Sequence, residues 1–298
     1  MFRIALIGAN SFLGRSLTFF FHNCGYKVDL FSRSKSIGEH PSMIFAFPNS
    51  LPDFSVFLEY DIVIYSVAAG VQSSSKPDTD EFYQLNSFLP IQITKYLGSH
   101  NFKGTFFTFG SYFEIGENRV VKYLDEDEVA LSNYRVNNDY CLSKRLLTRF
   151  VNSSTSDIRH FHLILPSIYG RNENLNRLIP YIVRNIKGNA DFQLTSGIQI
   201  RQYLHVNDVA ECIVLFSSKS LQSGIYNLSS NNHLQIRDLV DIIFRFFGKD
   251  PEVHLGKAQK RDESMPVLML SNKKARSCGW NPKISLFEGI SDVISSFE

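Results

Sequence analysis

Three side chains near the middle of the chain have the chemistry needed to give a proton to a reacting oxygen. Tyr140 and Lys144 are four residues apart in a segment of helical periodicity, so they lie on one face of the expected helix. An ammonium group beside a phenol stabilises the phenolate and draws its pKa of about 10 toward neutrality. Ser111, just after an apolar run, adds a hydroxyl group. We therefore expect Tyr140 to act as a general acid, assisted by Lys144 and Ser111.

A glycine-containing turn stands near the N-terminus, between an apolar run and a segment of helical periodicity. Gly8 makes the turn, and Gly14 allows the helix to pack closely on the strand. Ser11 stands where a third glycine is expected. The turn and the helix N-terminus are predicted to bind the pyrophosphate of a dinucleotide. The predicted contacts come from Gly8, Asn10, Ser11, Phe12, Leu13 and Gly14.

The tip of the second expected strand bears on the choice of dinucleotide. A free ribose 2′-hydroxyl needs an acidic partner there, whereas a 2′-phosphate needs a cation. The sequence has Ser32-Arg33-Ser34, and Asp29 falls inside the strand. We expect Arg33 to bind a phosphate as a planar fork, with Ser32 as an additional donor. NADP(H) is therefore favoured and NAD(H) stays open, while the competing interpretation of Arg33 is a solvated surface residue.

The elements that must position these residues follow an alternating pattern. Short apolar runs alternate with helical segments, which is typical of a parallel sheet covered by helices on both faces. The predicted fold class is α/β, a Rossmann-type doubly wound parallel sheet with a smaller, interleaved C-terminal substrate lobe. Strands are expected at 3–8, 27–31, 61–67, 105–109 and 161–165, and helices at 13–24, 81–97 and 139–151.

After Pro166 the alternation of short apolar runs and helical segments becomes less regular. A loop rich in Pro, Gly and Asn covers 166–176. We predict a dinucleotide-binding domain at 1–166, to which a later strand within 201–228 returns, and a substrate lobe at 167–298. Further helices are expected at 177–187, 235–247 and 285–297, and strands at 201–206 and 224–228.

The composition excludes several classes of protein. The 298 residues, 44% of them hydrophobic, suffice for a large core, and a net charge of +2 is too small to favour a nucleic-acid polymer as partner. Four cysteines without a CxxC pair predict reduced thiols, with neither a disulfide scaffold nor a metal site. No apolar run approaches the ~20 residues that span a bilayer. The N-terminal run leads into the glycine turn, so we predict a cytoplasmic protein without a membrane partner.

Together these segments resemble the extended short-chain dehydrogenase/reductases, in particular the NAD-dependent epimerase/dehydratase branch that acts on nucleotide sugars. Besides the glycine turn and the Tyr140/Lys144 pair, residues 61–69 are similar to the strand that ends beside the cofactor. Ser111 matches the family's catalytic serine or threonine, and Asn86 its active-site helix asparagine. The resemblance implies further cofactor contacts at Ala68, Ala69 and Pro166.

The C-terminal half resembles the family's substrate-binding segments. Residues 167–170 look like the loop after the sixth strand, with Ser167 in place of the usual asparagine. Residues 201–208 resemble the segment that places an arginine on the nucleotide diphosphate, and Arg261 matches a second such position. The substrate contacts implied by the resemblance are Ser111, Ser167, Asn174, Arg177, Arg201 and Arg261. Without the resemblance, each arginine reads as a surface cation.

The residues after Ser111 narrow the choice among the reactions of this family. The family's sugar 4,6-dehydratases have an Asp-Glu pair there, whereas this chain has Tyr112-Phe113. The resemblance thus implies NADPH-dependent reduction of the C4 ketone of a CDP- or dTDP-linked 4-keto-6-deoxy sugar, in deoxysugar and surface polysaccharide biosynthesis. The alternatives are a 4-epimerase with tightly bound NAD and a non-catalytic dinucleotide-binding sensor. A homodimer is also implied.

Three other features favour structural roles. His205, beside the helix cap expected at 207–208, is interpreted as structural. Cys141 points away from Tyr140 on the helix, which favours packing over nucleophilic chemistry. The acidic run at 125–128 is expected in a solvated loop.

Overall fold

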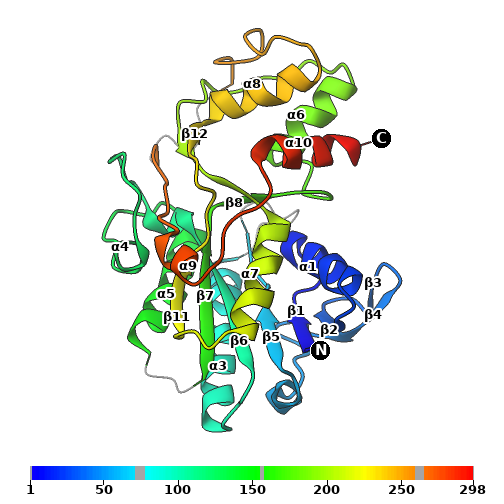
Figure 1. The fold of residues 1–298 in the computed structure, drawn as a ribbon, viewed down its shortest axis with the longest axis vertical. Coiled ribbons are helices and arrows are strands. Elements are labelled where there is room, and N and C mark those ends of the chain that lie inside the picture. Colours follow the sequence, from blue (N-terminus) through cyan, green and yellow to red (C-terminus); the bar gives the residue numbers. More distant parts are fainter. Residues whose placement is uncertain (1, 71–77, 155–157, 259–264, 298) are drawn as a thin grey trace.

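The computed structural model describes residues 2–70, 78–154, 158–258 and 265–297. Its centre is one large sheet in the strand order β11-β7-β6-β5-β1-β2-β4-β3, parallel except where β3 pairs with β4 (Figure 1). The predicted α/β, doubly wound parallel architecture is confirmed. The strands of this sheet are β1 (Arg3–Ile7), β2 (Lys27–Ser32), β3 (Ser36–Ile37), β4 (His40–Ile44), β5 (Ile62–Tyr65), β6 (Thr105–Ser111), β7 (Arg159–Leu165) and β11 (Gly224–Asn227).

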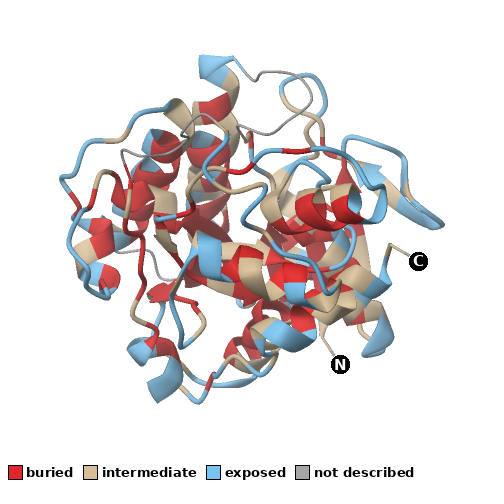
Figure 2. Ribbon diagram, turned by 90° about the horizontal axis from the view of Figure 1, so that it is seen from above, coloured by how far each residue is buried: buried red, intermediate tan, exposed pale blue. Residues whose placement is uncertain are grey.

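Helices cover both faces of the sheet, and its central strands β5 and β6 are buried along their whole length. On one face α1 (Phe12–Asn23) and α7 (Val206–Ser218) share a core with β1, β6 and β7. The other face packs against α3 (Leu89–Ser99) and α5 (Asp139–Ser153). The buried residues concentrate around these central strands (Figure 2). The shorter helices nearby are η1 (Phe54–Glu59), α2 (Thr79–Tyr83), η2 (Gln84–Phe88), η3 (Tyr112–Ile115), α4 (Glu126–Ala130) and α9 (Lys273–Ser277).

A second core lies among three helices of the C-terminal part, drawn at the top of Figure 1. These helices are α6 (Leu178–Lys187), α8 (Ile236–Phe246) and α10 (Leu286–Ser295). Two small sheets join this part to the large sheet: β8 (Ser167–Tyr169) with β10 (Tyr203–His205), and β9 (Ile200–Arg201) with β12 (Leu234–Gln235). Between β10 and β12, the chain returns as β11 to the edge of the large sheet beside β7.

Some elements differ from the sequence-based expectation. The single strand expected at 201–206 is two short strands that pair outside the large sheet. The elements at 36–59 and α9 were not predicted, and of α7 only a cap at 207–208 was expected. The acidic run at 125–128 does not form a solvated loop: Asp125 caps α4, and the Glu126 carboxylate is buried and accepts a hydrogen bond from the Asn227 N–H at 2.9 Å.

Candidate active site

Ser111 and Tyr140 meet at the carboxyl end of β6. Ser111 is the last residue of that strand and also caps η3, where its N–H donates to the Glu114 carboxylate at 3.0 Å. Tyr140 lies in the first turn of α5, near enough to Ser111 that the serine hydroxyl lowers the pKa of its phenol. The two hydroxyl groups that the sequence predicts to act together are therefore neighbours, at the edge where open parallel sheets bind ligands.

The Tyr140 phenol is protonated at neutral pH. Burial raises its pKa above 10, while the nearby Ser111 hydroxyl and the charge of Arg177 lower it. The prediction that Lys144 draws this pKa toward neutrality is wrong for this structure, because the Lys144 ammonium instead donates to the Phe109 carbonyl at 2.8 Å. A phenol that keeps its proton still suits a general acid.

Lys144 is buried under the same edge of the sheet, with 6% of its surface exposed. Burial lowers the pKa of its ammonium to about 8, and the neighbouring Glu114 opposes that shift. Lys144 is therefore a cation that can release its proton near neutral pH.

Asn86 lies in the π-helical turn η2 and joins two parts of the site. Its amide exchanges hydrogen bonds with the backbone of Ala69, at 2.9 and 3.0 Å, and donates to the Ser143 hydroxyl at 3.0 Å. Ala69, just beyond β5, is thus tied to α5, while Ala68 is exposed. Asn86 positions these segments and has both of its amide heteroatoms engaged.

The glycine turn has the geometry that its sequence predicts. A Cβ on Gly8 would lie 2.7 Å from the Val67 nitrogen, and one on Gly14 would lie 2.3 Å from the Gly8 oxygen. Gly8 also has φ of +89°, which favours glycine. Ser11 caps α1, since its hydroxyl accepts from the Gly14 N–H at 2.9 Å.

This turn fits a bound dinucleotide. Among the described residues, the N–H groups of Phe12 and Leu13 in the first turn of α1 have no hydrogen-bond acceptor. Unsatisfied amides at a helix N-terminus bind anionic groups such as a pyrophosphate. The adjacent Asn10 carbonyl accepts from Arg15 at 3.1 Å.

Arg33 follows β2 directly and is exposed. It forms no ion pair or hydrogen bond with any residue that the structure describes. Ser32 is buried and its hydroxyl donates to the Ser34 carbonyl at 2.7 Å, so it shapes the turn that presents Arg33. Asp29 is engaged elsewhere, by the Tyr60 hydroxyl at 2.9 Å and by Arg3 at 3.2 Å. The guanidinium is thus available at the strand tip and the carboxylate is not.

Buried tyrosines extend the site toward the C-terminal part. Pro166 is buried between β7 and β8, and Ser167 follows it. The Ser167 and Tyr112 hydroxyls are 2.8 Å apart, and Tyr112 is fully buried. Burial also raises the pKa of Tyr203, whose nearest influences include Tyr112 and Arg201. Tyr112, at the position of the dehydratase acid, thus contributes a buried phenol to the site and no carboxylate.

Arg177 and Arg201 have different surroundings. Arg177 pairs at 2.5 Å with the buried Glu173, whose pKa burial raises to about 7. Arg201 is 3% exposed, and one of its nitrogens donates to the carbonyls of Ile200 and Pro266, at 2.9 and 3.3 Å. Among the described residues it has no carboxylate partner.

Asn174 and Arg261 are the other two residues predicted to bind the substrate. The Asn174 side chain is exposed and closes a turn by accepting from the Asn176 N–H at 2.9 Å. Arg261 lies outside the described residues.

Comparison with known proteins identifies the family. The model of the NAD dependent epimerase/dehydratase family matches residues 4–229. The chain belongs to this family. The resemblance inferred from the glycine turn and the Tyr140/Lys144 pair is thereby confirmed, and a nicotinamide dinucleotide is the family's cofactor.

The individual relatives share little sequence identity with this chain. The chain is 20% identical to the CDP-abequose synthase of Salmonella muenchen over 303 residues, covering 99% of this chain and 98% of the relative. It superposes on the UDP-glucose 4-epimerase of Thermotoga maritima with UDP-glucose at a TM-score of 0.83, with 17% identity, covering 99% and 98% of the two chains. The chain also superposes on the dTDP-glucose 4,6-dehydratase of Bacillus anthracis in complex with NAD at a TM-score of 0.81. The two share 18% sequence identity, and the match covers 100% of this chain and 96% of that one. At these identities the structures show a shared fold.

Sequence reasoning about this family member missed two buried carboxyl groups. Glu114 and Glu173 both have pKa values raised by burial to about 7. Glu114 stands at the third position after Ser111, where the capping-box spacing was a usable signal. Glu173 had no such signal in the sequence.

The interpretations of His205 and Cys141 as structural are confirmed. The His205 side chain accepts from the Asn207 N–H and caps α7, so the cap is His205 itself and not the expected 207–208 pair. Cys141 packs in the core under α5. The four cysteines are free thiols.

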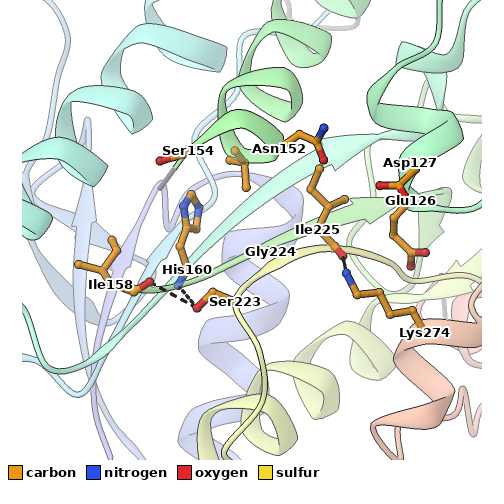
Figure 3. Close-up of a pocket in the computed structure, with 11 residues that line it drawn as sticks. Glu126, Asp127, Asn152, Ser154, Ile158, His160, Ser223, Gly224, Ile225 and Lys274 are labelled. Carbon is orange, nitrogen blue, oxygen red and sulfur yellow. Dashed lines mark hydrogen bonds between the residues drawn. The ribbon is translucent and has the colours of Figure 1, made fainter. Parts of the chain in front are cut away.

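A cavity of about 250 Å³ lies at the opposite, amino-terminal edge of the sheet (Figure 3). It is lined by the starts of β7 and β11 and by parts of α4 and α5. His160 and Lys274 stand on its wall. It is not the place where a parallel sheet binds its cofactor. Among the described residues, no helix is both long and apolar enough to cross a membrane.

Proposed function

We propose that this chain uses NADPH to reduce the C4 ketone of a CDP- or dTDP-linked 4-keto-6-deoxy sugar. The observation that carries the proposal is that Ser111 and Tyr140 are neighbours at the end of β6, where the buried Lys144 donates to the Phe109 carbonyl. Tyr112 in the position of the dehydratase carboxylate leaves this site without the residue that eliminates water. Reduction without elimination is the reaction that these residues support best.

The proposed mechanism assigns one task to each side chain. Bound NADPH supplies the hydride. Ser111 holds the substrate carbonyl oxygen, and Tyr140 gives that oxygen its proton. Lys144, held by the Phe109 carbonyl, would bond the nicotinamide ribose, and Asn86 keeps α5 in register with the cofactor-side loop. Acid catalysis of this kind contributes about 10² to 10⁴ in rate.

The choice of NADPH rests on the tip of β2. Arg33 is exposed and unpaired among the described residues, whereas Asp29 is held by Tyr60 and Arg3. A planar guanidinium matches a phosphate with two hydrogen bonds. We therefore assign the 2′-phosphate to Arg33. Gly8, Gly14 and the free amides of 12–13 would hold the pyrophosphate, with Ala68, Ala69 and Pro166 nearby.

Arg201 supports an anionic substrate. A buried guanidinium is costly unless its donors and charge are matched. Two of its three nitrogens have no acceptor among the described residues, which suits the diphosphate of a nucleotide sugar. Ser167, Asn174 and Arg177 are the other proposed substrate contacts, with Arg261 as a further prediction.

The relatives agree with a nucleotide-sugar substrate. One is named for the synthesis of CDP-abequose, and the fold neighbours are named for UDP-glucose and dTDP-glucose. The role in polysaccharide synthesis and the cytoplasmic location stay predictions. A homodimer is supported by exposed apolar side chains on η2 and α5, at Phe88, Leu142 and Leu146.

The deciding experiment follows NADPH absorbance after purified chain is mixed with CDP- or dTDP-4-keto-6-deoxyglucose. Net oxidation of NADPH, with NMR showing a new C4 hydroxyl, is the expected result. Interconversion of C4 epimers without net oxidation would identify an epimerase, and binding without turnover a sensor. Replacing NADPH by NADH tests the cofactor assignment.

A further inference from the structure

The strand end that carries Ser111 is paired on one side only. β7 pairs with β6 as far as Ser111, which lies opposite Leu165, whereas β5 pairs with β6 only as far as Phe107. In the proposed reduction, Ser111 and Tyr140 act on the same substrate oxygen from two different elements, β6 and α5. Groups that act together in this way must be held to within about 0.5 Å of the productive geometry. A contact between this strand end and α5 is therefore needed.

The Glu114 carboxylate makes that contact. Its Oε1 accepts from the Ser111 N–H at 3.0 Å, and its Oε2 accepts from the Thr148 hydroxyl of α5 at 2.5 Å. Glu114 and Thr148 are fully buried, so both bonds are shielded from water. Thr148 and Tyr140 lie on the same side of α5, eight residues apart. The carboxylate thus joins Ser111 to the helix that carries the proposed acid.

The turn that carries Glu114 is itself fixed to α5. Arg145 donates to the Glu114 carbonyl through Nε at 2.8 Å and through a terminal nitrogen at 2.6 Å. The same terminal nitrogen donates to the Ile115 carbonyl at 2.9 Å. Both the side chain and the backbone of Glu114 are therefore bonded to one helix.

Two neighbours shape the space around the carboxylate. A Cβ on Gly110 would lie 2.5 Å from Glu114 and 2.8 Å from His162, so glycine leaves the room that both side chains occupy. With Glu114 ionised, Thr148 gives its single proton to the carboxylate, and its oxygen accepts from Nε2 of His162 at 2.9 Å. The polar face of β7 thus orients the threonine that holds Glu114.

The hydroxyl of Ser111 stays able to donate. Its oxygen accepts from the Phe113 N–H at 3.4 Å, which together with the Glu114 bond closes the capping box of η3. A hydroxyl that accepts a hydrogen bond keeps its own proton for another acceptor. The geometry therefore leaves the Ser111 proton for a substrate oxygen.

Both protonation states of Glu114 keep the connection. Burial raises the pKa of Glu114 to about 7, against its hydrogen bonds and the charges of Lys144 and Arg145, which lower it. When the carboxyl is protonated, one oxygen still accepts from the Ser111 N–H and the other donates to the Thr148 hydroxyl. The connection thus needs an acceptor of the right reach, which an amide also provides.

We propose that Glu114 is a positioning residue for the reduction, because its carboxyl group fixes Ser111 relative to Tyr140 so that both hydroxyl groups meet one substrate oxygen. This inference rests on the proposed function, in which Ser111 holds that oxygen and Tyr140 protonates it. Glu114 itself neither touches the substrate nor exchanges a proton with it.

The first test needs no turnover. In ¹H–¹⁵N NMR of the ligand-free chain, the Ser111 amide proton should shift with pH, with an apparent pKa of about 7, as the carboxyl group that it bonds titrates. Glu114→Gln should remove this step. Lys144, with a pKa of about 8, and Tyr140 titrate at higher pH and are unchanged in this variant. A wild-type Ser111 amide without the step overturns the proposal.

The second test is a double-mutant cycle with Ser111→Ala. Glu114→Met keeps the length of the side chain but cannot accept from the Ser111 N–H, so it should lower kcat by about 10- to 100-fold. The KM for NADPH should not change. In the Ser111→Ala background the same substitution should cost less than about 2-fold, because the hydroxyl that Glu114 positions is already absent.

Rescue and control variants separate positioning from folding. Glu114→Gln should recover most of the kcat that Glu114→Met loses. Thr148→Val cuts the connection at its other end and should also lower kcat, and Thr148→Ser should restore it. The matched control is Glu288→Met, since Glu288 accepts from the Ser285 N–H at 3.0 Å in the capping box of α10. This control should leave kcat at the wild-type value.

The outcomes distinguish this inference from the proposed function. Equal slowing by Glu114→Met with and without the Ser111 hydroxyl refutes the positioning role alone. If Glu114→Met does not fold, Thr148→Val takes its place in the cycle. A chain that interconverts C4 epimers without net reduction refutes the proposed reduction, and the cycle is then run on that interconversion. A chain without turnover of either kind refutes both.

Discussion

The two faces of β6 and β7 are built from different residues. Toward α1 and α7 the strands present Phe107, Phe109, Phe161 and Leu163, all in one apolar core. Toward α5 the same strands present Thr108, His160 and His162. Burying polar groups costs free energy unless each is hydrogen-bonded, and here they bond to one another. The apolar face contributes stability, whereas the polar face fits a chemical task.

The largest effect is expected at the edge where the two faces meet the reacting groups. Tyr140→Phe removes the proposed acid and should lower kcat by about 10² to 10⁴. NADPH affinity, measured by fluorescence titration, should stay close to wild type, because the ring and its packing remain. Undiminished turnover in this variant would remove Tyr140 from the mechanism.

A large-to-small substitution on the apolar face should destabilise the folded chain without changing its catalytic activity. Phe161 is fully buried and packs against Phe107, Phe216 and Tyr226. Phe161→Ala should reduce the free energy of unfolding by about 3 to 5 kcal/mol, measured in urea. Turnover per folded molecule should be unchanged. A small stability loss with a large loss of kcat would reverse the roles assigned to the two faces.

The polar face should make the stability of the folded chain depend on pH. Glu114 has a pKa of about 7 in the folded chain instead of 4.5, so between these values the folded state holds a proton that the unfolded state has released. Its contribution to stability is therefore lost as pH rises through that window. The stability of Glu114→Gln relative to wild type should increase from about pH 5 to about pH 8.

The control for this pH effect is Glu128→Gln. Hydrogen bonding to Lys122 lowers the pKa of Glu128 from 4.5, so its contribution to stability changes only at more acidic pH, and the relative stability of Glu128→Gln should stay level from about pH 5 to about pH 8. Parallel curves for the two variants would contradict the assignment to Glu114.

The smallest effect concerns a residue outside both faces. Arg33→Ala should raise the KM for NADPH about 10-fold, equivalent to about 1.4 kcal/mol, because one charge-assisted phosphate contact is lost. The KM for NADH should not change. An equal rise for both cofactors would indicate that Arg33 supports the turn and does not read the 2′-phosphate.

The alternation of apolar and helical segments was enough to predict the central sheet, since parallel strands buried on both faces are mostly apolar runs. The glycine turn and the Tyr140/Lys144 spacing predicted the site's place in the fold, because both are local patterns. The short strands β8, β9, β10 and β12 were not separable by sequence, as two- and three-residue strands have no measurable period.

The residue types and their spacing along the chain therefore determined which groups could carry chemistry: a phenol and an amine one helical turn apart, and a serine at a strand end. Only the tertiary structure decided their protonation, because pKa values depend on burial and on neighbours far away in sequence. It turned the Lys144 ammonium toward a backbone carbonyl, buried Glu114 below it, and aligned two threonines with two histidines from separate strands and a helix.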